Sequence, residues 1–128
     1  MVTIASLVQK YKSLDKKIAV LFLKTGLNQI PLEKLHSAFY KLKQDHKEFL
    51  SDLHFTSKGS SPVSEDLQQT FPVLCFKGAY MSCPNPEYVN YTLNPTQKNR
   101  IKKYILPIFA EDEEEIKQMA DELKGLLK

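Results

Sequence analysis

The sequence predicts a mainly helical domain that contains one small β-hairpin, which is an α+β fold. Two observations support this prediction. Over most of the chain, apolar residues recur three and four positions apart, the spacing of one helix face. Between Ala79 and Leu93 the spacing changes to every second residue, which is typical of strands. The length of 128 residues suits a single domain over residues 1–128.

Two helices are predicted near the N-terminal end. The first covers residues 4–11 and carries four apolar residues on one face: Ile4, Leu7, Val8 and Tyr11. The second follows a break at residues 13–15 and has a similar face: Leu14, Ile18, Leu21 and Phe22. Because residues 18–23 are all apolar, we expect this second helix to be the most buried element. Gly26 then provides a C-terminal stop.

A third helix is expected to begin at Pro31, because a helix does not need the N–H of its first residue. Its apolar face consists of Leu32, Leu35, Phe39 and Leu42. Phe49, Leu50 and Leu53 extend this face into a second short helical piece. Residues 56–62, which are rich in serine and contain glycine and proline, are the clearest loop of the chain.

A fourth helix is expected after Ser64, a good N-cap residue, with Glu65 and Asp66 in the first turn, where the helix dipole favours negative charge. Its buried face consists of Leu67, Phe71 and Leu74. Pro72 removes one backbone hydrogen bond and should kink or shorten this helix. Gly78 should end it.

The hairpin alternates over residues 79–82 and 88–93, and the turn-rich residues 83–87 join its strands. Two further helices are predicted over residues 95–127. The first begins at Asn94-Pro95, is limited by Pro107, and has an inward face of four residues: Ile101, Tyr104, Ile105 and Ile108. The last helix spans roughly 111–127, and its inward residues are Ile116, Met119, Ala120, Leu123 and Leu127.

The composition argues against several classes of protein. Apolar residues make up 42% of the chain and charged residues 26%, which is ordinary for a globular domain. The longest apolar run, residues 18–23, is far shorter than the roughly 20 residues needed to cross a bilayer, and no secretory signal is recognised. Cys75 and Cys83 are too few for a disulfide framework, and Cys75 is interpreted as a small core residue. We therefore expect a cytoplasmic protein without a membrane partner.

No catalytic, metal or cofactor site is predicted. The serines beside Gly59 lack the Gly-x-Ser-x-Gly elbow of hydrolases, and residues 58–61 lack the glycine spacing of a P-loop. His36, His46 and His54 are too widely spaced to form the close pairs of zinc sites. The acidic residues around His46 are interpreted as a solvated helix face. The chain is therefore expected not to be an enzyme.

Charge is unevenly distributed along the chain. Residues 1–50 carry nine lysines against four acidic residues, whereas the last 18 residues carry three lysines against seven acidic residues. Arg100 is the one arginine among eighteen basic residues, although arginine's planar fork is the group that best reads guanine and phosphate. The basic excess suits attraction to a polyanion but is poorly equipped to read a sequence.

Residues 55–93 resemble a known arrangement. They combine a loop, the helix from Ser64 to Gly78, and a hairpin that contains Tyr88 and Tyr91. This order resembles the second half of winged-helix domains, in which a recognition helix runs into a β-wing. The resemblance implies a winged-helix-like part over about residues 31–93, flanked by N- and C-terminal helices.

More narrowly, the segment resembles small bacterial and archaeal proteins of the YwgA and Panacea (SocA-like) kind. Those proteins carry a Gly-Pro-Tyr-Ser-type turn before the helix. Residues 61–64, Ser-Pro-Val-Ser, keep the proline and the serine but have Val63 in place of tyrosine, and Pro72 interrupts the helix. Some proteins of the Panacea type act as antitoxin or phage-defence modules, so the resemblance implies either DNA binding or protein binding.

The first functional hypothesis is a regulator that binds DNA as a homodimer through residues 58–77 and the hairpin at 79–93. Its candidate contacts are Lys58, Ser61, Gln68, Gln69, Lys77, Lys98 and Arg100. The acids of Ser64-Glu65-Asp66 would, however, lie close to the phosphates. The alternative is a protein-interaction module that uses the acidic run 111–115 and the last helix. Its candidate contacts are Glu111, Asp112, Glu113, Met119 and Leu123.

Overall fold

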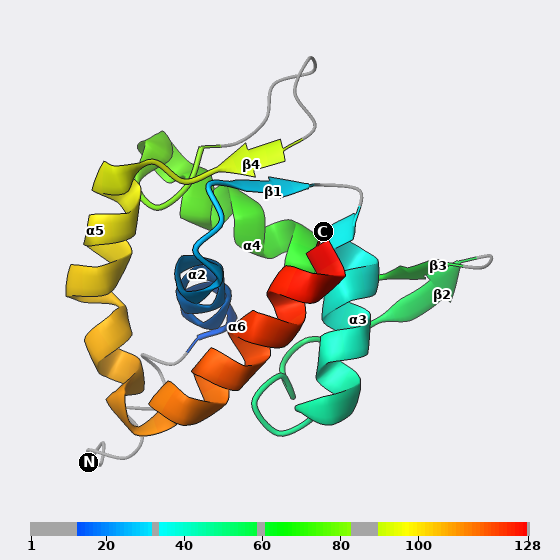
Figure 1. Ribbon diagram of the computed structural model, residues 1–128. Coiled ribbons are helices and arrows are strands. Elements are labelled where there is room, and N and C mark those ends of the chain that lie inside the picture. The colour runs from blue at the N-terminus through cyan, green and yellow to red at the C-terminus, as the bar shows by residue number, and fades with distance from the viewer. Residues whose placement is uncertain (1–12, 32–33, 59–60, 83–89, 128) are drawn as a thin grey trace, which may run out of the picture.

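The computed structural model describes residues 13–31, 34–58, 61–82 and 90–127 of the chain. Helices predominate in these ranges, and short antiparallel strand pairs accompany them (Figure 1). The predicted α+β class is therefore confirmed. The first predicted helix, residues 4–11, lies outside the described residues.

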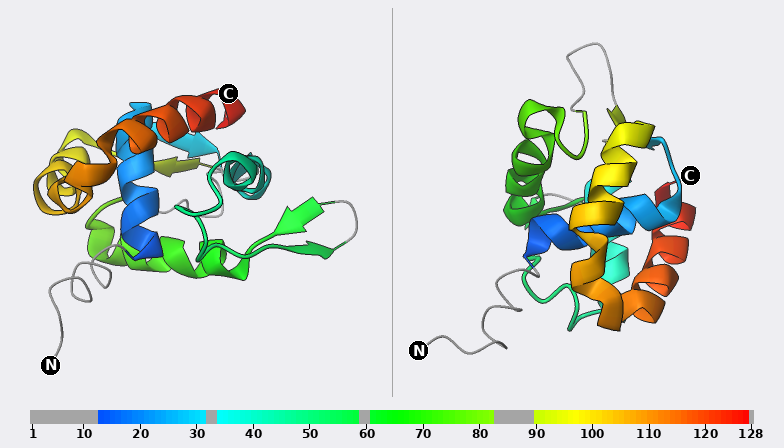
Figure 2. Two further views of the ribbon diagram at one scale, coloured as in Figure 1. Left: turned by 90° about the horizontal axis from the view of Figure 1, so that it is seen from below. Right: turned by 90° about the vertical axis from the view of Figure 1, so that its left-hand side faces the viewer.

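Helix α2 (Leu14–Thr25) lies at the centre of the molecule. Its residues 18–22 are each at most 1% exposed, as the run of apolar residues predicts. Helices α4 (Glu65–Cys75) and α6 (Glu113–Leu127) lie on opposite sides of α2 (Figure 2). Helix α5 (Pro95–Tyr104) also contacts α2. Burial of the apolar faces of these helices against α2 is the main stabilising contribution to this core.

Three helix ends follow the prediction from sequence. Gly26 ends α2 with a φ of 73°, a left-handed conformation that glycine adopts without a steric penalty. The Ser64 side chain accepts a hydrogen bond from the backbone N–H of Leu67 (3.2 Å) at the start of α4. Asn94 accepts from the N–H of Gln97 (2.8 Å), while the Gln97 side chain accepts from the N–H of Asn94 (2.9 Å). This reciprocal pair is a capping box.

Strand β1 (Gln29–Pro31) pairs antiparallel with strand β4 (Asn90–Thr92), and Ile30 lies opposite Tyr91. Ser82 is a second partner of β4. Its N–H donates to the carbonyl oxygen of Thr92 (2.9 Å), and the N–H of Thr92 donates to that of Ser82 (3.1 Å). The two sides of the predicted hairpin therefore meet at Ser82 and Thr92, while residues 83–89 lie outside the described residues. The pairing with β1 was not predicted.

The third helix begins later than predicted. Pro31 ends β1 instead of opening a helix, and α3 (Leu35–Asp45) starts four residues further on. Because Pro31 has no N–H to donate to a strand ladder, its place at the end of an edge strand is a natural one. Phe39 and Leu42 are buried as predicted, and Leu32 lies outside the described residues.

The segment between α3 and α4 also differs from the prediction. The expected short helix near Leu50 and Leu53 is a series of turns, although both side chains are fully buried. The expected loop at 56–62 holds two antiparallel strands, β2 (Thr56–Lys58) and β3 (Ser61–Val63), which project from the helical body (Figures 1 and 2). These strands are short and mostly polar, so they lack the alternation of apolar residues that identifies a strand.

Prolines and glycine shape the remaining helix ends. Helix α4 passes through Pro72 and ends at Cys75, where the three-residue turn η2 (Phe76–Gly78) follows. Beyond α5, the 3-10 segment η3 (Leu106–Asp112) leads into α6. Tyr104 was predicted to face inward but is 60% exposed, because α5 ends at this residue and the chain changes direction there.

Candidate functional site

The exposed side of α4 and the residue that follows it form a continuous surface, which we call the α4 face. It consists of Glu65, Gln68, Gln69, Pro72, Val73 and Phe76, all of which are exposed. At 100° per residue these positions fall on one side of a helix. Val73 is 56% exposed and Phe76 is 67% exposed. The α4 face therefore presents apolar side chains to solvent at its C-terminal end.

The packing of α4 fixes which side it exposes. Leu67, Phe71 and Leu74 are each at most 4% exposed. The ring of Phe71 stacks on Phe22 of α2 (centroids 6.2 Å apart) and on Tyr91 of β4 (4.4 Å). These contacts anchor α4 to both the central helix and the strand pair. The α4 face is consequently held outward by the same side chains that build the core.

The charge of the α4 face is negative at its N-terminal end. Residues 64–76 contain Glu65 and Asp66 but no lysine or arginine. Asp66 accepts a hydrogen bond from the backbone N–H of His54 (2.8 Å), and its Oδ2 lies 3.0 Å from Nδ1 of the same histidine. The face thus runs from acidic through amide to apolar side chains.

A hollow lies where the first turn of α2 meets α4, and we call it the α2–α4 hollow. Its volume is about 320 Å³, and its lining residues are Leu14, Asp15, Asp52, Asp66, Gln69, Thr70 and Val73. Lys17 approaches it from α2, with its Nζ 3.4 Å from Asp52 Oδ1 and a hydrogen bond to the carbonyl oxygen of Phe49 (2.7 Å). Three carboxylates and two apolar side chains therefore surround one open space.

The structure does not gather the predicted DNA contacts into one cluster. Gln68 and Gln69 are exposed together on the α4 face. Lys98 donates to the side-chain oxygen of Asn28. Arg100 donates to the carbonyl oxygen of Ala79 (3.0 Å) and more weakly to that of Gly78 (3.4 Å). Lys98 and Arg100 of α5 thus bind protein groups near the strands.

Three other predicted DNA contacts have described backbones only. Lys58 belongs to β2, Ser61 to β3 and Lys77 to η2. Strands β2 and β3 directly precede α4, and η2 directly follows it. The backbone therefore places these residues before and after α4.

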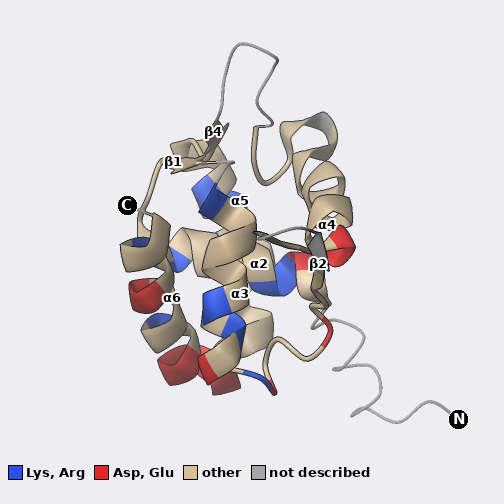
Figure 3. Ribbon diagram, turned by 90° about the vertical axis from the view of Figure 1, so that its right-hand side faces the viewer, with Lys and Arg blue, Asp and Glu red and all other residues tan. Residues whose placement is uncertain are grey.

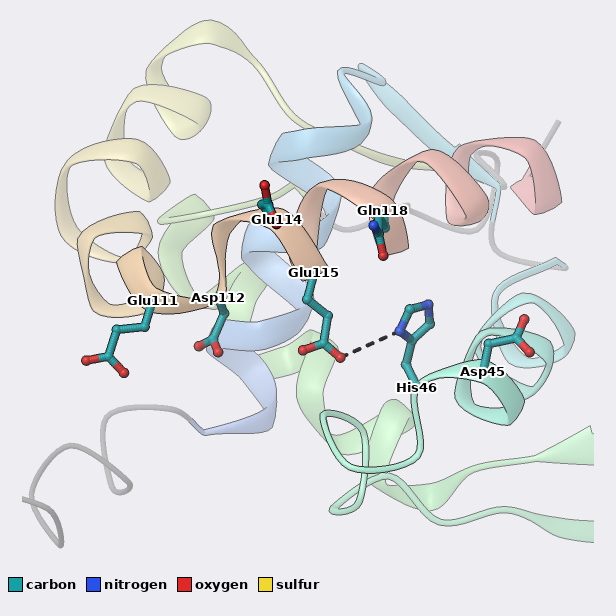
Figure 4. A pocket seen from close by; sticks show the side chains of 7 residues that line it. All are labelled: Asp45, His46, Glu111, Asp112, Glu114, Glu115 and Gln118. Atoms are coloured by element: carbon teal, nitrogen blue, oxygen red, sulfur yellow. Dashed lines mark ion pairs between the residues drawn. The ribbon is translucent and has the colours of Figure 1, made fainter.

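A hollow, which we call the acidic cleft, lies between the C-terminal end of α3 and the start of α6. Acidic residues gather at the start of α6 (Figure 3). The volume of the cleft is about 530 Å³, and its lining residues are Asp45, His46, Glu111, Asp112, Glu114, Glu115 and Gln118. The His46 ring lies between two carboxylates. Its Nδ1 is 3.6 Å from Glu115 Oε1 (Figure 4), and its Nε2 is 3.1 Å from Glu122 Oε2. Sequence spacing gave no signal for this contact, because it joins segments about 70 residues apart.

Two of the predicted partner contacts are unavailable. Met119 and Leu123 are both 0% exposed, because the apolar face of α6 is used to pack against α2 and α3. This corrects the expectation that the last helix offers them to a partner. Glu111 and Glu113 are exposed and Asp112 is half-buried, so the acidic part of the predicted surface is accessible.

His36 has a structural contact rather than a metal-binding arrangement. Its Nδ1 accepts a hydrogen bond from the backbone N–H of Ser64 (3.0 Å), which ties α3 to the start of α4. Burial lowers the pKa of His36, because a partly buried site disfavours its charged form. Within the described ranges, no three His, Cys, Asp or Glu side chains come together as a metal site requires.

Cys75 was predicted to be a small core residue, and the structure corrects this. Its side chain is half-buried against the core and is disulfide-bonded. The sequence holds one other cysteine, Cys83, which lies outside the described residues.

Among the described helices, none is long and apolar enough to cross a membrane. Comparison with protein-family models, curated proteins and solved structures finds no match. The α4 face, the α2–α4 hollow and the acidic cleft are therefore the basis for assigning a function. The sequence contained a signal for the first of these, because Val73 and Phe76 lie off the buried stripe of α4 on a helical projection.

Proposed function

We propose that this chain is a non-enzymatic, winged-helix-like module that binds a protein partner through the α4 face. The observation that carries the proposal is the composition of that face. It exposes Val73 and Phe76 next to two glutamines and has no cation between residues 64 and 76. Interface cores are enriched in aromatic and apolar side chains and depleted in charge.

The order of the elements supports the winged-helix-like part of the proposal. Helix α4 runs through η2 to Ser82, which bridges to Thr92 of β4, and β4 pairs with β1. In winged-helix domains a recognition helix likewise runs into strands that form a wing. Here β1 would anchor those strands to the helical body, and α4 would take the place of the recognition helix.

The charge of the α4 face favours a protein partner over duplex DNA. Affinity for DNA comes largely from lysine and arginine placed against phosphates. A recognition helix that starts with Glu65 and Asp66 and continues to Phe76 without a basic residue opposes such contacts. A complementary partner segment would place apolar side chains on Val73 and Phe76 and a basic residue near Glu65.

Val73→Asp tests this surface. Because Val73 is exposed, the change should alter stability by only about 0.5 kcal/mol, whereas a charge in the apolar part of an interface should abolish binding. The control is Tyr104→Asp, which places the same charge on an exposed apolar residue of α5. We expect affinity capture from the native source to recover the same partner with the unmodified chain and the control but not with Val73→Asp. Equal recovery with all three would contradict the proposal.

A second candidate function is binding of duplex DNA as a homodimer. It is favoured by the order of α4 and the strands, and by the exposure of Gln68 and Gln69 on α4. Lys77 belongs to η2, which directly follows α4, and would supply positive charge. If the chain binds DNA in this way, replacement of Gln68, Gln69 and Lys77 together with alanine should abolish its binding to duplex DNA.

The acidic cleft is the surface that the sequence suggested for a partner, and a basic protein segment would suit it. Reversal of charge at Glu111, Asp112 and Glu113 would then release the partner, whereas Val73→Asp would not. The homodimer and the cytoplasmic location both stay predictions, and the disulfide at Cys75 favours an oxidising compartment instead.

A further inference from the structure

Helix α5 leads through η3 into α6 at a bend, and we call the exposed outer side of this bend the corner ridge (Figure 1). The corner ridge consists of Lys103, Tyr104, Pro107, Ala110 and Glu111, all of which are exposed. We propose that two copies of this chain bind each other through their corner ridges, about a two-fold axis near Pro107. The inference does not rest on the proposed function, because the corner ridge shares no residue with the α4 face.

The core determines which side chains form the corner ridge. Ile105 is 3% exposed and Phe109 is 0% exposed, so both turn inward at the bend. The backbone of Phe109 leaves the helical range (φ −105°, ψ 24°), and η3 contacts both α5 and α6. The residues beside these two anchors, Tyr104 and Ala110, are therefore turned to solvent.

Charge changes sign along the corner ridge. Residues 95–110 contain four basic residues and no acidic residue, whereas residues 111–115 are all acidic. Lys103 thus lies at a basic end of the ridge and Glu111 at an acidic end, with apolar side chains between them. A surface of this kind is complementary to a second copy of itself that is turned by half a rotation.

The spacing of the corner ridge about Pro107 fits this two-fold arrangement. Lys103 and Glu111 lie four positions before and after Pro107, and Tyr104 and Ala110 lie three positions before and after it. In a two-fold interface, residue i of one copy contacts residue j of the other, and j contacts i. Lys103 of each copy would then face the partner's Glu111, and Tyr104 would cover the partner's Ala110.

Tyr104 supplies the apolar part of the contact. Its side chain is 60% exposed, and the Nζ of Lys103 lies 5.3 Å from the centroid of its ring. Aromatic side chains are enriched in interfaces, because one ring buries a large apolar area. The contact with the ring also keeps the ammonium group of Lys103 at the corner ridge.

The small size of the corner ridge implies a weak dimer. A standard stable interface has roughly 20–30 residues on each side, whereas the corner ridge has five. Ion pairs at exposed positions contribute little and are screened by salt. We therefore expect a dimer that forms at high protein concentration and dissociates on dilution or when salt is added.

Analytical ultracentrifugation of the full chain, from micromolar to millimolar concentration, tests the dimer. We expect a reversible monomer–dimer equilibrium that weakens as the salt concentration rises. Lys103→Glu should weaken it about tenfold, because two attractive contacts per dimer become repulsive. The control is Lys102→Glu, which makes the same change in net charge at an exposed residue about 200° around α5 from Tyr104, and it should leave the dimer intact. A monomer at millimolar concentration in low salt, or equal weakening by the two variants, would overturn the proposal.

Exchange of the two charges tests the pairing itself. Glu111→Lys alone should weaken the dimer as Lys103→Glu does, and the double variant should recover the affinity of the unmodified chain. An equimolar mixture of the two single variants should also associate, because each carries the charge that the other has lost. If the double variant and the mixture both stay monomeric, Lys103 and Glu111 do not face each other and the two-fold pairing is wrong.

Discussion

His36 and Gln97 show how single side chains connect elements that are distant in sequence. His36 accepts the backbone N–H of Ser64, the residue that caps α4. Gln97 is 3% exposed, completes the cap of α5, and also donates to the carbonyl oxygen of Gly78 (3.0 Å) and to the hydroxyl of Ser82 (3.0 Å). The sequence suggested neither role, because both depend on partners that only the fold brings close.

The contact made by His36 predicts a dependence of stability on pH. Burial lowers its pKa below 6.5 in the folded protein, so the unfolded chain binds more protons and stability falls as the pH drops through 6.5. Protonation also converts the accepting Nδ1 into a donor, which the Ser64 N–H cannot serve. We expect urea unfolding midpoints at pH 7.5 and 5.5 to differ more in the unmodified chain than in His36→Asn, whose side-chain oxygen accepts without titrating. Equal differences in the two proteins would refute this role.

At the scale of elements, the sequence predicted the long helices well. The apolar runs of α2 and α6 and the caps at Ser64 and Asn94 lie where their patterns indicate, because each is a local signal within one helix. Strands β1 and β2–β3 could not be predicted in the same way. Each has three residues, too few to show a period of two, and β1 is defined by pairing with a strand some 60 residues away.

Gln97→Ala tests the connection between α5 and the strands. The change removes half of the capping box and the two hydrogen bonds to η2 and Ser82. We expect a loss of about 2 kcal/mol in the free energy of unfolding, because buried polar partners are left unpaired. Thr96→Ala, at the exposed neighbouring position, should cost less than about 0.5 kcal/mol. Chemical denaturation of the two variants checks this, and equal losses would show that the buried hydrogen bonds contribute little.

At the scale of the whole molecule, the total charge of each segment can be counted in the sequence, but the fold decides which charged side chains lie next to one another. The net charge of +3 combines a lysine-rich first part with an acidic last part. The fold brings Asp45 and His46 against the acidic start of α6 (Figure 4). It also turns Gln68, Gln69 and Val73 of α4 outward, within residues 64–76, which contain no lysine or arginine. The candidate surfaces thus depend on which sides of α3, α4 and α6 the core covers, and Met119 and Leu123 were assigned wrongly for that reason.

The measurement that most directly tests a protein-binding rather than DNA-binding α4 face is fluorescence anisotropy with a mixed-sequence DNA duplex. It should be made with the purified full chain at low and at near-physiological salt. We predict no binding above a weak, salt-sensitive background, because Glu65 and Asp66 lie where a recognition helix would meet phosphates. Tight binding that decreases when Gln68, Gln69 and Lys77 are replaced together with alanine would contradict this account and establish the chain as a DNA-binding protein.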